Sequence, residues 1–432
     1  MFVKHFPLIL AGTMRTWVIR PRDKKIAKNA AKTALLATAA LAMAYAVTPS
    51  PLTAVATAAT AIVQNHAFHE SMQTECHWRK FYDREDFDFE TWSDSRCQSF
   101  LHFPKAGVEE LARLFFLPKM RFRDSSGYVN ALHYDDNDEP FWATRNRGKF
   151  SLMECVTTVL LRMRAKDPWV MLATHLGGRH ISAYKMIFRE MVQALHDFWF
   201  DRLTDLTRHE SDVLQWADLI EAKTHASPRT IGFLDDTWLQ TCKPGGPDMI
   251  QRQLFNRYHR GHGLKWQSVC APVGLILDLF GPMIGRHSDS TMLGRSNLKA
   301  KLAAVSAAIG YHIIVYADSA YAATPHVMRG LKRNMIYTYA QRRCNKVMNR
   351  VRTSVEWGFG VMKTDWPFLE HPGNAKIFQS PIGLIWPLAA LLSNCRTCYV
   401  GGNIISDFFQ PDPAAPIRLA PTLAQYLDLS DI

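Results

Sequence analysis

Hydrophobic periodicity is clearest from residue 151 onward. Ser151, followed three residues later by Glu154, is typical of a capping box that begins a helix over 152–164. A short helix over 169–176 follows and then, after a pair of glycines, a longer helix over 181–199. Apolar side chains recur every three or four residues along this last helix: Ile181, Tyr184, Ile187, Phe188, Met191, Val192 and Leu195. The pattern predicts a helix-turn-helix unit, and a plain three-helix bundle fits it equally well.

Short apolar runs replace the helical pattern after residue 228. A strand, a hairpin, a helix, a second strand and a long helix follow one another, which is an α/β order of elements. We assign this α/β domain to 228–400 and treat 401–432 as a C-terminal tail. The predicted strands span 230–234, 265–270, 273–279 and 312–316, and the predicted helices span 298–308 and about 345–363.

Two segments precede the helical region. Residues 1–67 are a low-complexity, Ala-rich extension in which basic residues precede an apolar stretch over 33–47. A membrane helix needs about 20 strongly apolar residues, and this stretch is shorter and mostly Ala, so a helical or disordered extension is expected. A targeting or membrane segment remains the alternative. Residues 68–140 carry acidic and aromatic clusters with one amphipathic helix over 108–115, which indicates a helical or irregular region.

Composition narrows the class of protein. The 432 residues are 47% hydrophobic and 21% charged, as in globular proteins, which excludes global disorder and collagen-like chains. Eight cysteines are too few for a disulfide scaffold and favour a reducing compartment. The 51 Lys and Arg residues exceed the 39 Asp and Glu residues, and the resulting net charge of +12 favours a polyanionic partner such as nucleic acid.

Three acids lie at the ends of predicted strands or within the predicted long helix. Asp235 ends one predicted strand, Asp318 follows another, and Glu356 lies in the middle of the long helix. On neighbouring parallel strands the two aspartates would lie close together, and a helix packed over the strand ends would bring the glutamate to them. Clustered carboxylates repel one another unless cations lie between them, so the trio predicts two Mg²⁺ or Mn²⁺ ions and phosphodiester chemistry. Taken singly, each aspartate could equally form a turn or a helix cap, and the glutamate a surface ion pair.

Basic side chains near these elements are candidates for DNA contact. Arg and Lys near the start of the helix over 181–199 are placed where a reader of the major groove needs them. Cations that flank metal-binding acids suit a phosphate backbone. The candidate DNA-binding residues are Arg179, Lys185, Arg189, Arg350, Arg352 and Lys363.

Five motifs carry a family resemblance. Residues 233–238 read Phe-Leu-Asp-Asp-Thr-Trp, residues 317–321 read Ala-Asp-Ser-Ala-Tyr, and residues 355–360 read Val-Glu-Trp-Gly-Phe-Gly. Between them lie Arg-Tyr-His-Arg-Gly-His-Gly-Leu-Lys-Trp-Gln over 257–267 and Arg-His-Ser-Asp-Ser-Thr-Met-Leu over 286–293. These motifs resemble segments of PIF/Harbinger-type DDE transposases, and their order along the chain and their spacing suit that family. In the order given above, the family segments are Asp-Gly-Thr-His, Gly-Asp-Ser-Gly-Tyr, Val-Glu-Arg-Ala-Phe-Gly, His-Lys-Arg-x-His-Gly and His-Asp-Ser-x-x-Leu.

The resemblance covers roughly residues 150–400. It implies an RNase H-like catalytic core, a mixed sheet with flanking helices, preceded by an all-α helix-turn-helix region over 141–205. It also implies an endonuclease that cuts and joins DNA, with Asp235, Asp318 and Glu356 as metal-binding catalytic acids. Double-stranded DNA as substrate, a nuclear location, a separate Myb-like DNA-binding partner and a homo-oligomeric active complex follow from the same resemblance.

The motifs depart from the family pattern at several positions, and three of these departures bear on the site. Trp238 replaces the usual histidine of the first motif. Asp236 replaces the usual glycine beside the first acid, and we expect it to face solvent rather than to act as an alternative ligand. Ser288 interrupts the His-Asp-Ser segment, so we assign Asp289 a structural role. The departures at Asp236 and Ser288 keep one alternative open, namely a domesticated DNA-binding protein without catalytic activity. The Ala-rich leader leaves a second alternative open, an organelle-targeted or membrane-tethered nuclease.

Overall fold

The computed structural model describes residues 87–428, apart from short gaps. The described residues belong to a single compact unit. The predicted Ala-rich extension over 1–67 lies outside the described residues, as does the second glycine of the pair at 177–178. The gaps are 116–120, 124–128, 135–139, 145–147, 178, 226–228, 246–247, 333–335, 371–374 and 378–379, and side chains are also left undescribed over 121–140 and 143–149 and at Leu203.

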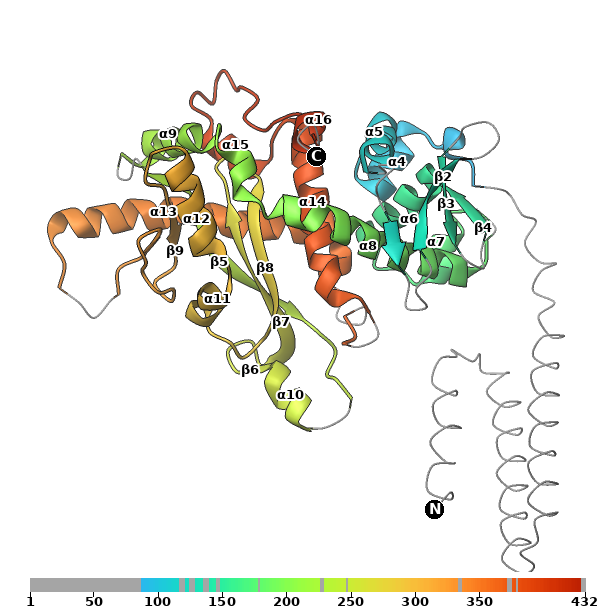
Figure 1. The fold of residues 1–432 in the computed structure, drawn as a ribbon, viewed down its shortest axis with the longest axis horizontal. Helices are drawn as coiled ribbons and strands as arrows, with labels where there is room; N and C mark the ends of the chain where they lie inside the picture. Colours follow the sequence, from blue (N-terminus) through green and yellow to red (C-terminus); the bar gives the residue numbers. More distant parts are fainter. Residues whose placement is uncertain are drawn as a thin grey trace, which may run out of the picture. The chain divides into compact units, whose positions relative to one another are not determined.

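The first part of this unit combines helices with an antiparallel sheet (Figure 1). The prediction of an all-α region over 141–205 is wrong at its start, because two strands lie within 140–151. Trp142 and Phe150 face each other across these strands and both are fully buried. The elements are η3 (Phe89–Thr91), α4 (Asp94–Leu101), α5 (Lys105–Phe115), β1 (Arg121–Arg123), β2 (Val129–Tyr134), β3 (Pro140–Thr144) and β4 (Gly148–Ser151), with the strands in the order β1-β2-β3-β4.

The three helices predicted after residue 151 are confirmed as α6 (Leu152–Arg164), α7 (Trp169–Ala173) and α8 (Ile181–Leu203). Ser151 caps α6 by accepting a hydrogen bond from the Glu154 backbone N–H. Helix α8 packs against α6 and α14 (Ile382–Val400), so most of its surface is buried. Among its described side chains the exposed ones are Lys185, Arg189, Asp197 and Asp201.

A mixed sheet forms the centre of the second part (Figure 1). Its strands run in the order β10-β9-β5-β7, with β8 and β6 also paired to β7. The pairs β5–β9 and β9–β10 are parallel, whereas β5–β7 and β7–β8 are antiparallel, which confirms a mixed α/β domain. The strands are β5 (Thr230–Gln240), β6 (Phe255–Asn256), β7 (Gly261–Cys270), β8 (Ile276–Ile284), β9 (Ile314–Ala317) and β10 (Val327–Arg329).

Helices flank this sheet. The predicted helix over 298–308 is confirmed as α12 (Leu298–Ala308), and the long helix is confirmed as α13 (Tyr339–Asp365), which begins earlier than predicted because Thr338 and Gln341 form a capping box. The remaining elements are η4 (Leu206–His209), α9 (Val213–Thr224), α10 (Asp248–Leu254), α11 (Asp289–Arg295), η5 (Pro367–Glu370), α14, α15 (Ile404–Phe409) and α16 (Leu423–Tyr426).

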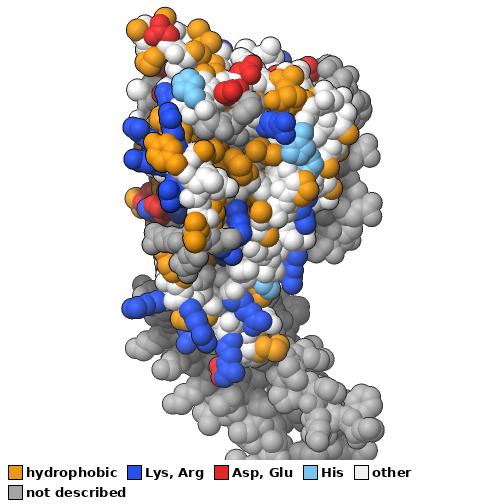
Figure 2. Space-filling view, turned by 90° about the vertical axis from the view of Figure 1, so that its left-hand side faces the viewer, with side chains coloured by type: hydrophobic (Ala, Val, Ile, Leu, Met, Phe, Trp, Pro, Cys, Tyr) orange, Lys and Arg blue, Asp and Glu red, His pale blue; other side chains and the backbone are white. Residues whose placement is uncertain are grey.

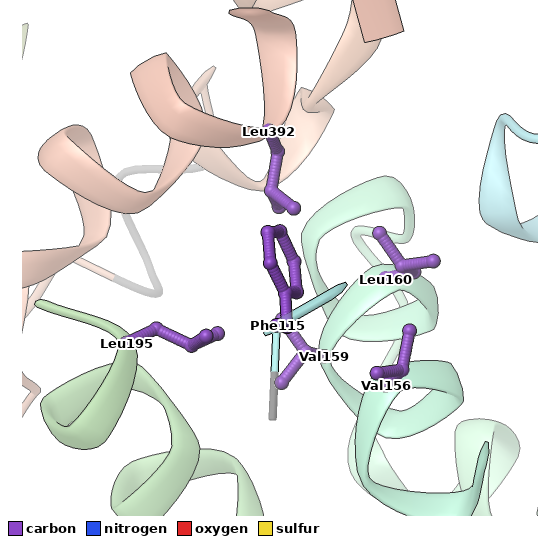
Figure 3. A pocket seen from close by; sticks show the side chains of 6 residues that line it. All are labelled: Phe115, Val156, Val159, Leu160, Leu195 and Leu392. Carbon is purple, nitrogen blue, oxygen red and sulfur yellow. The ribbon is translucent and has the colours of Figure 1, made fainter. Parts of the chain in front are cut away.

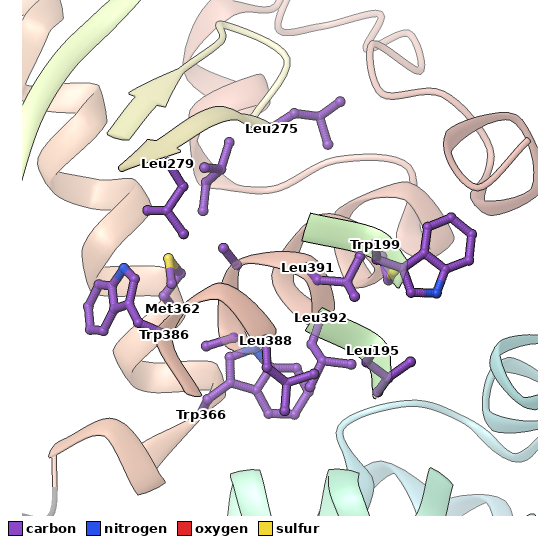
Figure 4. Packing of buried hydrophobic residues seen from close by; sticks show 14 of the residues in the cluster. Leu195, Trp199, Leu275, Leu279, Met362, Trp366, Trp386, Leu388, Leu391 and Leu392 are labelled. Atoms are coloured by element: carbon purple, nitrogen blue, oxygen red, sulfur yellow. The ribbon is translucent and has the colours of Figure 1, made fainter. Parts of the chain in front are cut away.

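Helix α14 joins the two parts through their common core (Figure 4). Its Leu388, Leu391 and Leu392 pack beside Leu195 and Trp199 of α8, which explains why this helix is apolar on all sides. The tail predicted over 401–432 contributes α15 and α16, which carry buried side chains into the same core. None of the helices within the described residues has the length and apolar character needed to cross a membrane.

Candidate active site

Strand β5 continues through the first acids instead of ending at them. The prediction of a strand end at Asp235 is wrong, because β5 pairs with β7 as far as Gln240. Its parallel pairing with β9, however, stops at the Leu234–Ala317 pair, and Asp318 directly follows Ala317. Asp235 and Asp318 therefore take equivalent positions on neighbouring parallel strands, which run about 4.8 Å apart in a sheet.

Glu356 reaches the same place from α13, which crosses β5, β7 and β9. The Tyr316 hydroxyl on β9 lies 3.0 Å from Asn349 Oδ1, a contact that holds the helix against the strands. Three residues further along α13, the Arg352 guanidinium donates to Asp235 Oδ2 at 3.0 Å and to Glu356 Oε1 at 3.1 Å. One cation therefore bridges the first and third acids.

The Asp235 carboxyl ionises with difficulty in this environment. Burial raises its pKa to about 6, against the lowering effect of the Arg352 guanidinium, and the negative charges of Glu356 and Asp318 add to the rise. Its side chain is 17% exposed, whereas that of Glu356 is 53% exposed. A cation at this position would offset the cost of burying the ionised Asp235 carboxylate and would reduce the repulsion among the three acids.

The fit of a divalent metal can be judged from the donor groups. As they stand, no three or more Asp, Glu, His or Cys side chains within the described residues are arranged to hold an ion, and the Arg352 guanidinium lies between two of the acids. The donors are nevertheless all carboxylate oxygens, the ligands that Mg²⁺ and Mn²⁺ prefer. Beside them, the buried Tyr321 hydroxyl has no hydrogen-bond partner among the described residues. The donor set therefore fits a hard divalent cation.

Asp236 points to the opposite face of β5, because successive side chains on a strand alternate. It does not face solvent as expected: its side chain is 15% exposed and its Oδ2 lies 2.7 Å from Lys265 Nζ. The same ammonium lies 2.6 Å from Asp289 Oδ1 at the first residue of α11. The assignment of a structural role to Asp289 agrees with this contact, since it ties α11 to the sheet.

This ion triad also reaches the loop that carries the second acid. Ser290, next to Asp289, donates from its hydroxyl to the Ala320 carbonyl at 2.7 Å. The Tyr321 N–H in turn donates to the Asp318 carbonyl at 3.1 Å. Strand β5, helix α11 and the loop after β9 are thus linked on the side of the sheet opposite Arg352.

The candidate DNA-binding residues differ in whether their side chains are available for contact with DNA. Arg179 donates to the buried Glu154 at 2.7 Å, and Arg352 is bound to the acids, so both guanidiniums are engaged within the protein. The others are exposed or half-buried: Lys185 and Arg189 on α8, and Arg350 and Lys363 on α13.

A basic row lies along the first half of α13. Arg342, Lys346 and Arg350 are exposed and four residues apart, so they share one side of the helix that leads towards Glu356. Figure 2 views the molecule from the end at which α13 begins, and Lys and Arg side chains gather on this face with few Asp or Glu among them. This surface is complementary to a phosphate backbone.

A small cavity in the core of the described structure is unrelated to these acids. It is an apolar gap among α5, α6, α8 and α14, too small for a water molecule, and Figure 3 shows its lining. The lining residues are Phe115, Val156, Val159, Leu160, Leu195 and Leu392. It is a packing defect in the core and does not compete with the acids as a functional site.

Comparison with known proteins bears on the same residues. Residues 235–394 match the family model described as DDE superfamily endonuclease. The matched segment begins at Asp235 and includes Asp318 and Glu356, which supports the broad DDE nuclease family and a nuclease function of the transposase type. No curated protein and no solved structure matches the chain.

Two features of this site were not expected from the sequence. Arg352 was expected to contact DNA, and its spacing of four from Glu356 was the only local sign of an ion pair. The Asp236–Lys265–Asp289 triad has no local sign, because its members come from two strands and a helix.

Proposed function

We propose that this chain is a metal-dependent DNA endonuclease of the PIF/Harbinger transposase type, with Asp235, Asp318 and Glu356 as its catalytic acids. One observation carries the proposal. The parallel register of β5 and β9 sets the two aspartates side by side, and the guanidinium that binds the first aspartate also binds the glutamate. The mixed sheet order supports an RNase H-like core for this domain.

The three carboxylates would hold two Mg²⁺ or Mn²⁺ ions. When bound, these ions would supply activation of a water or a 3′-hydroxyl and stabilisation of the leaving oxygen in an in-line displacement. The protein's own contribution is a fixed frame: β5 and β9 set the aspartate positions, and the contact of Tyr316 with Asn349 sets the distance of α13 from the strands.

Arg352 would have two roles in this scheme. Without metal, its guanidinium offsets the repulsion between Asp235 and Glu356. With metal, the acids no longer need it, and the side chain becomes available to a DNA phosphate, as the sequence predicts. The exposed row Arg342, Lys346 and Arg350 would hold the adjoining phosphates.

Recognition of a DNA sequence requires more than this chain offers on α8. A helix that reads the major groove presents several side chains to base edges, whereas α8 exposes the basic pair Lys185 and Arg189 and is otherwise largely buried. A separate Myb-like DNA-binding partner would supply the missing specificity. We further propose a nuclear location, where double-stranded DNA lies, and a homo-oligomer that joins two DNA ends.

Mg²⁺-dependent nicking of labelled duplex by the purified full chain tests the proposal. Asp318→Asn should lose at least about 100-fold in rate, because it removes a charged ligand while keeping the side chain's size. Asp218→Asn, at an exposed position on α9, is the matched control and should cleave as the parent does. Equal cleavage by the Asp318 variant and the control would refute the assignment.

A DNA-binding protein without catalysis is the second candidate. It is favoured by the ion pairs of Arg352, which occupy two of the three acids in the described structure. Steeply salt-dependent binding to duplex DNA, with no cleavage in Mn²⁺, would support this candidate.

A further inference from the structure

The turn between β6 and β7 presents four exposed side chains in a row, Arg257, Tyr258, His259 and Arg260. We call residues 257–260 the β6–β7 turn. The Tyr258 side chain is 89% exposed, more than an aromatic residue needs for any packing role. Neither arginine is ion-paired with a carboxylate of the described residues.

The turn is held in a defined shape. The Asn256 side-chain oxygen accepts hydrogen bonds from the backbone N–H groups of Tyr258 and His259 at 2.8 and 3.0 Å. The amide group of Asn256 donates to the Gly285 carbonyl at 2.6 Å, which ties the turn to the end of β8. Arg260 adopts a left-handed conformation with φ of 49°, which closes the turn.

Stacked aromatic rings support the β6–β7 turn. The His259 ring stacks on Trp238 of β5, with ring centroids 4.4 Å apart and planes only 5° from parallel. Trp238 lies flat against the backbone of β7, because a Cβ on Gly263 would come within 2.3 Å of the indole nitrogen. The Tyr258 ring stands perpendicular to His259, with ring centroids 5.0 Å apart, and most of its surface remains exposed.

We propose that the β6–β7 turn binds an unpaired DNA base, which stacks on the ring of Tyr258 while Arg257 and Arg260 hold the flanking phosphates. A rigid aromatic face between cations is the combination that single-stranded nucleic acid recognises, since every base has a π-face and every linkage a negative charge.

The turn stands on the strand that carries the first acid. Trp238 follows Asp235 by three residues on β5, about 10 Å along the strand, and lies on the alternate face, which is the face of Asp236. Lys363 of α13 is near enough to His259 to lower the pKa of that imidazole, after the larger effects of burial and Lys265. The inference rests on the proposed function, because it assigns to the turn the DNA that the endonuclease would cut.

Binding in EDTA tests the turn apart from cleavage. The full chain is titrated into a blunt duplex and into the same duplex with a single-stranded overhang that carries 2-aminopurine. Base stacking by an aromatic side chain contributes about 1–3 kcal/mol, so Tyr258→Ala should weaken overhang binding by about 5- to 150-fold and abolish the 2-aminopurine quenching. Tyr258→Phe should retain both, because the ring and not the hydroxyl carries the contact.

Tyr339→Ala is the matched control, since Tyr339 is 76% exposed at the start of α13 and should change overhang binding less than twofold. Unchanged overhang binding by Tyr258→Ala would overturn the inference. An equal loss on the blunt duplex, or an equal loss with Tyr258→Phe, would overturn it as well. Absence of Mg²⁺-dependent cleavage with these binding results intact would sink the endonuclease proposal alone.

Discussion

Replacement of Lys265 by Met would leave two buried carboxylates facing each other without a cation. Lys265 Nζ lies 2.7 Å from Asp236 and 2.6 Å from Asp289, and the three side chains are 8%, 15% and 21% exposed. Removal of one member of a buried ion pair costs about 3–5 kcal/mol, because the remaining charge stays desolvated. We expect a loss of this size in the free energy of unfolding at pH 8.

The loss of unfolding free energy in Lys265→Met should be smaller at low pH, and the ordinary pKa of Asp236 sets an upper limit to it. Burial and the charge of Asp289 raise the pKa of Asp236 above its ordinary value of 3.8, and loss of the ammonium raises it further. A folded protein that keeps this carboxyl protonated loses about 1.4 kcal/mol of unfolding free energy for each pH unit above 3.8. The loss is therefore at most about 6 kcal/mol at pH 8 and less than about 2 kcal/mol at pH 5. A group with a raised pKa in the folded state favours folding at low pH and loses this contribution as pH rises. The variant should therefore lose less than about 2 kcal/mol relative to the parent at pH 5.

Urea denaturation at the two pH values measures the effect. Lys299→Met, an exposed lysine on α12, is the control and should stay within about 0.5 kcal/mol of the parent at both. A Lys265→Met loss that is the same at pH 5 and pH 8 would show that the side chain stabilises by packing and not by charge, and would refute the reasoning.

Three further predictions concern charge in the same domain. Because burial raises the pKa of Asp235 to about 6, its ionised form destabilises the metal-free protein as pH rises from 4 to 6. Asp235→Asn should therefore gain roughly 1–3 kcal/mol at pH 7.5 but nothing at pH 4 in urea denaturation, and a loss at both would contradict this sign. Arg352→Gln frees Asp235 and Glu356 from their guanidinium, so Mn²⁺ should raise its thermal midpoint more than it raises that of the parent; an equal rise would exclude competition at this site. Lys301→Met strips the cation from Asp278, which is 2% exposed and 2.6 Å away, and should cost about 3–5 kcal/mol at pH 7.5, whereas a cost below 1 kcal/mol would show that the pair is solvated.

Local patterns in the sequence predicted the helices α6 to α8, α12 and α13 and the order of elements along the chain, but not the order of the strands in the sheet. The periodicity over 152–164 and 298–308 became α6 and α12 with the same bounds, because an amphipathic helix is specified by residues three and four apart. The strands β1–β4 escaped prediction, because their stabilising contacts, such as Trp142 against Phe150, join short segments with no period of their own.

The candidate site was likewise predicted only in part. The sequence picked out Asp235 and Asp318 at predicted strand ends and Glu356 within the predicted long helix, and the motifs around them carried the assignment. It could not show that β5 runs on past Asp235, because that extension depends on hydrogen bonds from β7.

Charge partners were decided by the tertiary structure alone. The sequence determined which residues carry charge and on which strand or helix they lie. Only the packed sheet decided that Arg352 binds an aspartate 117 residues away and that Lys265 lies between two buried acids. The physical reason is that an ion pair depends on separation in space and on exclusion of water, and neither quantity exists until the chain has folded.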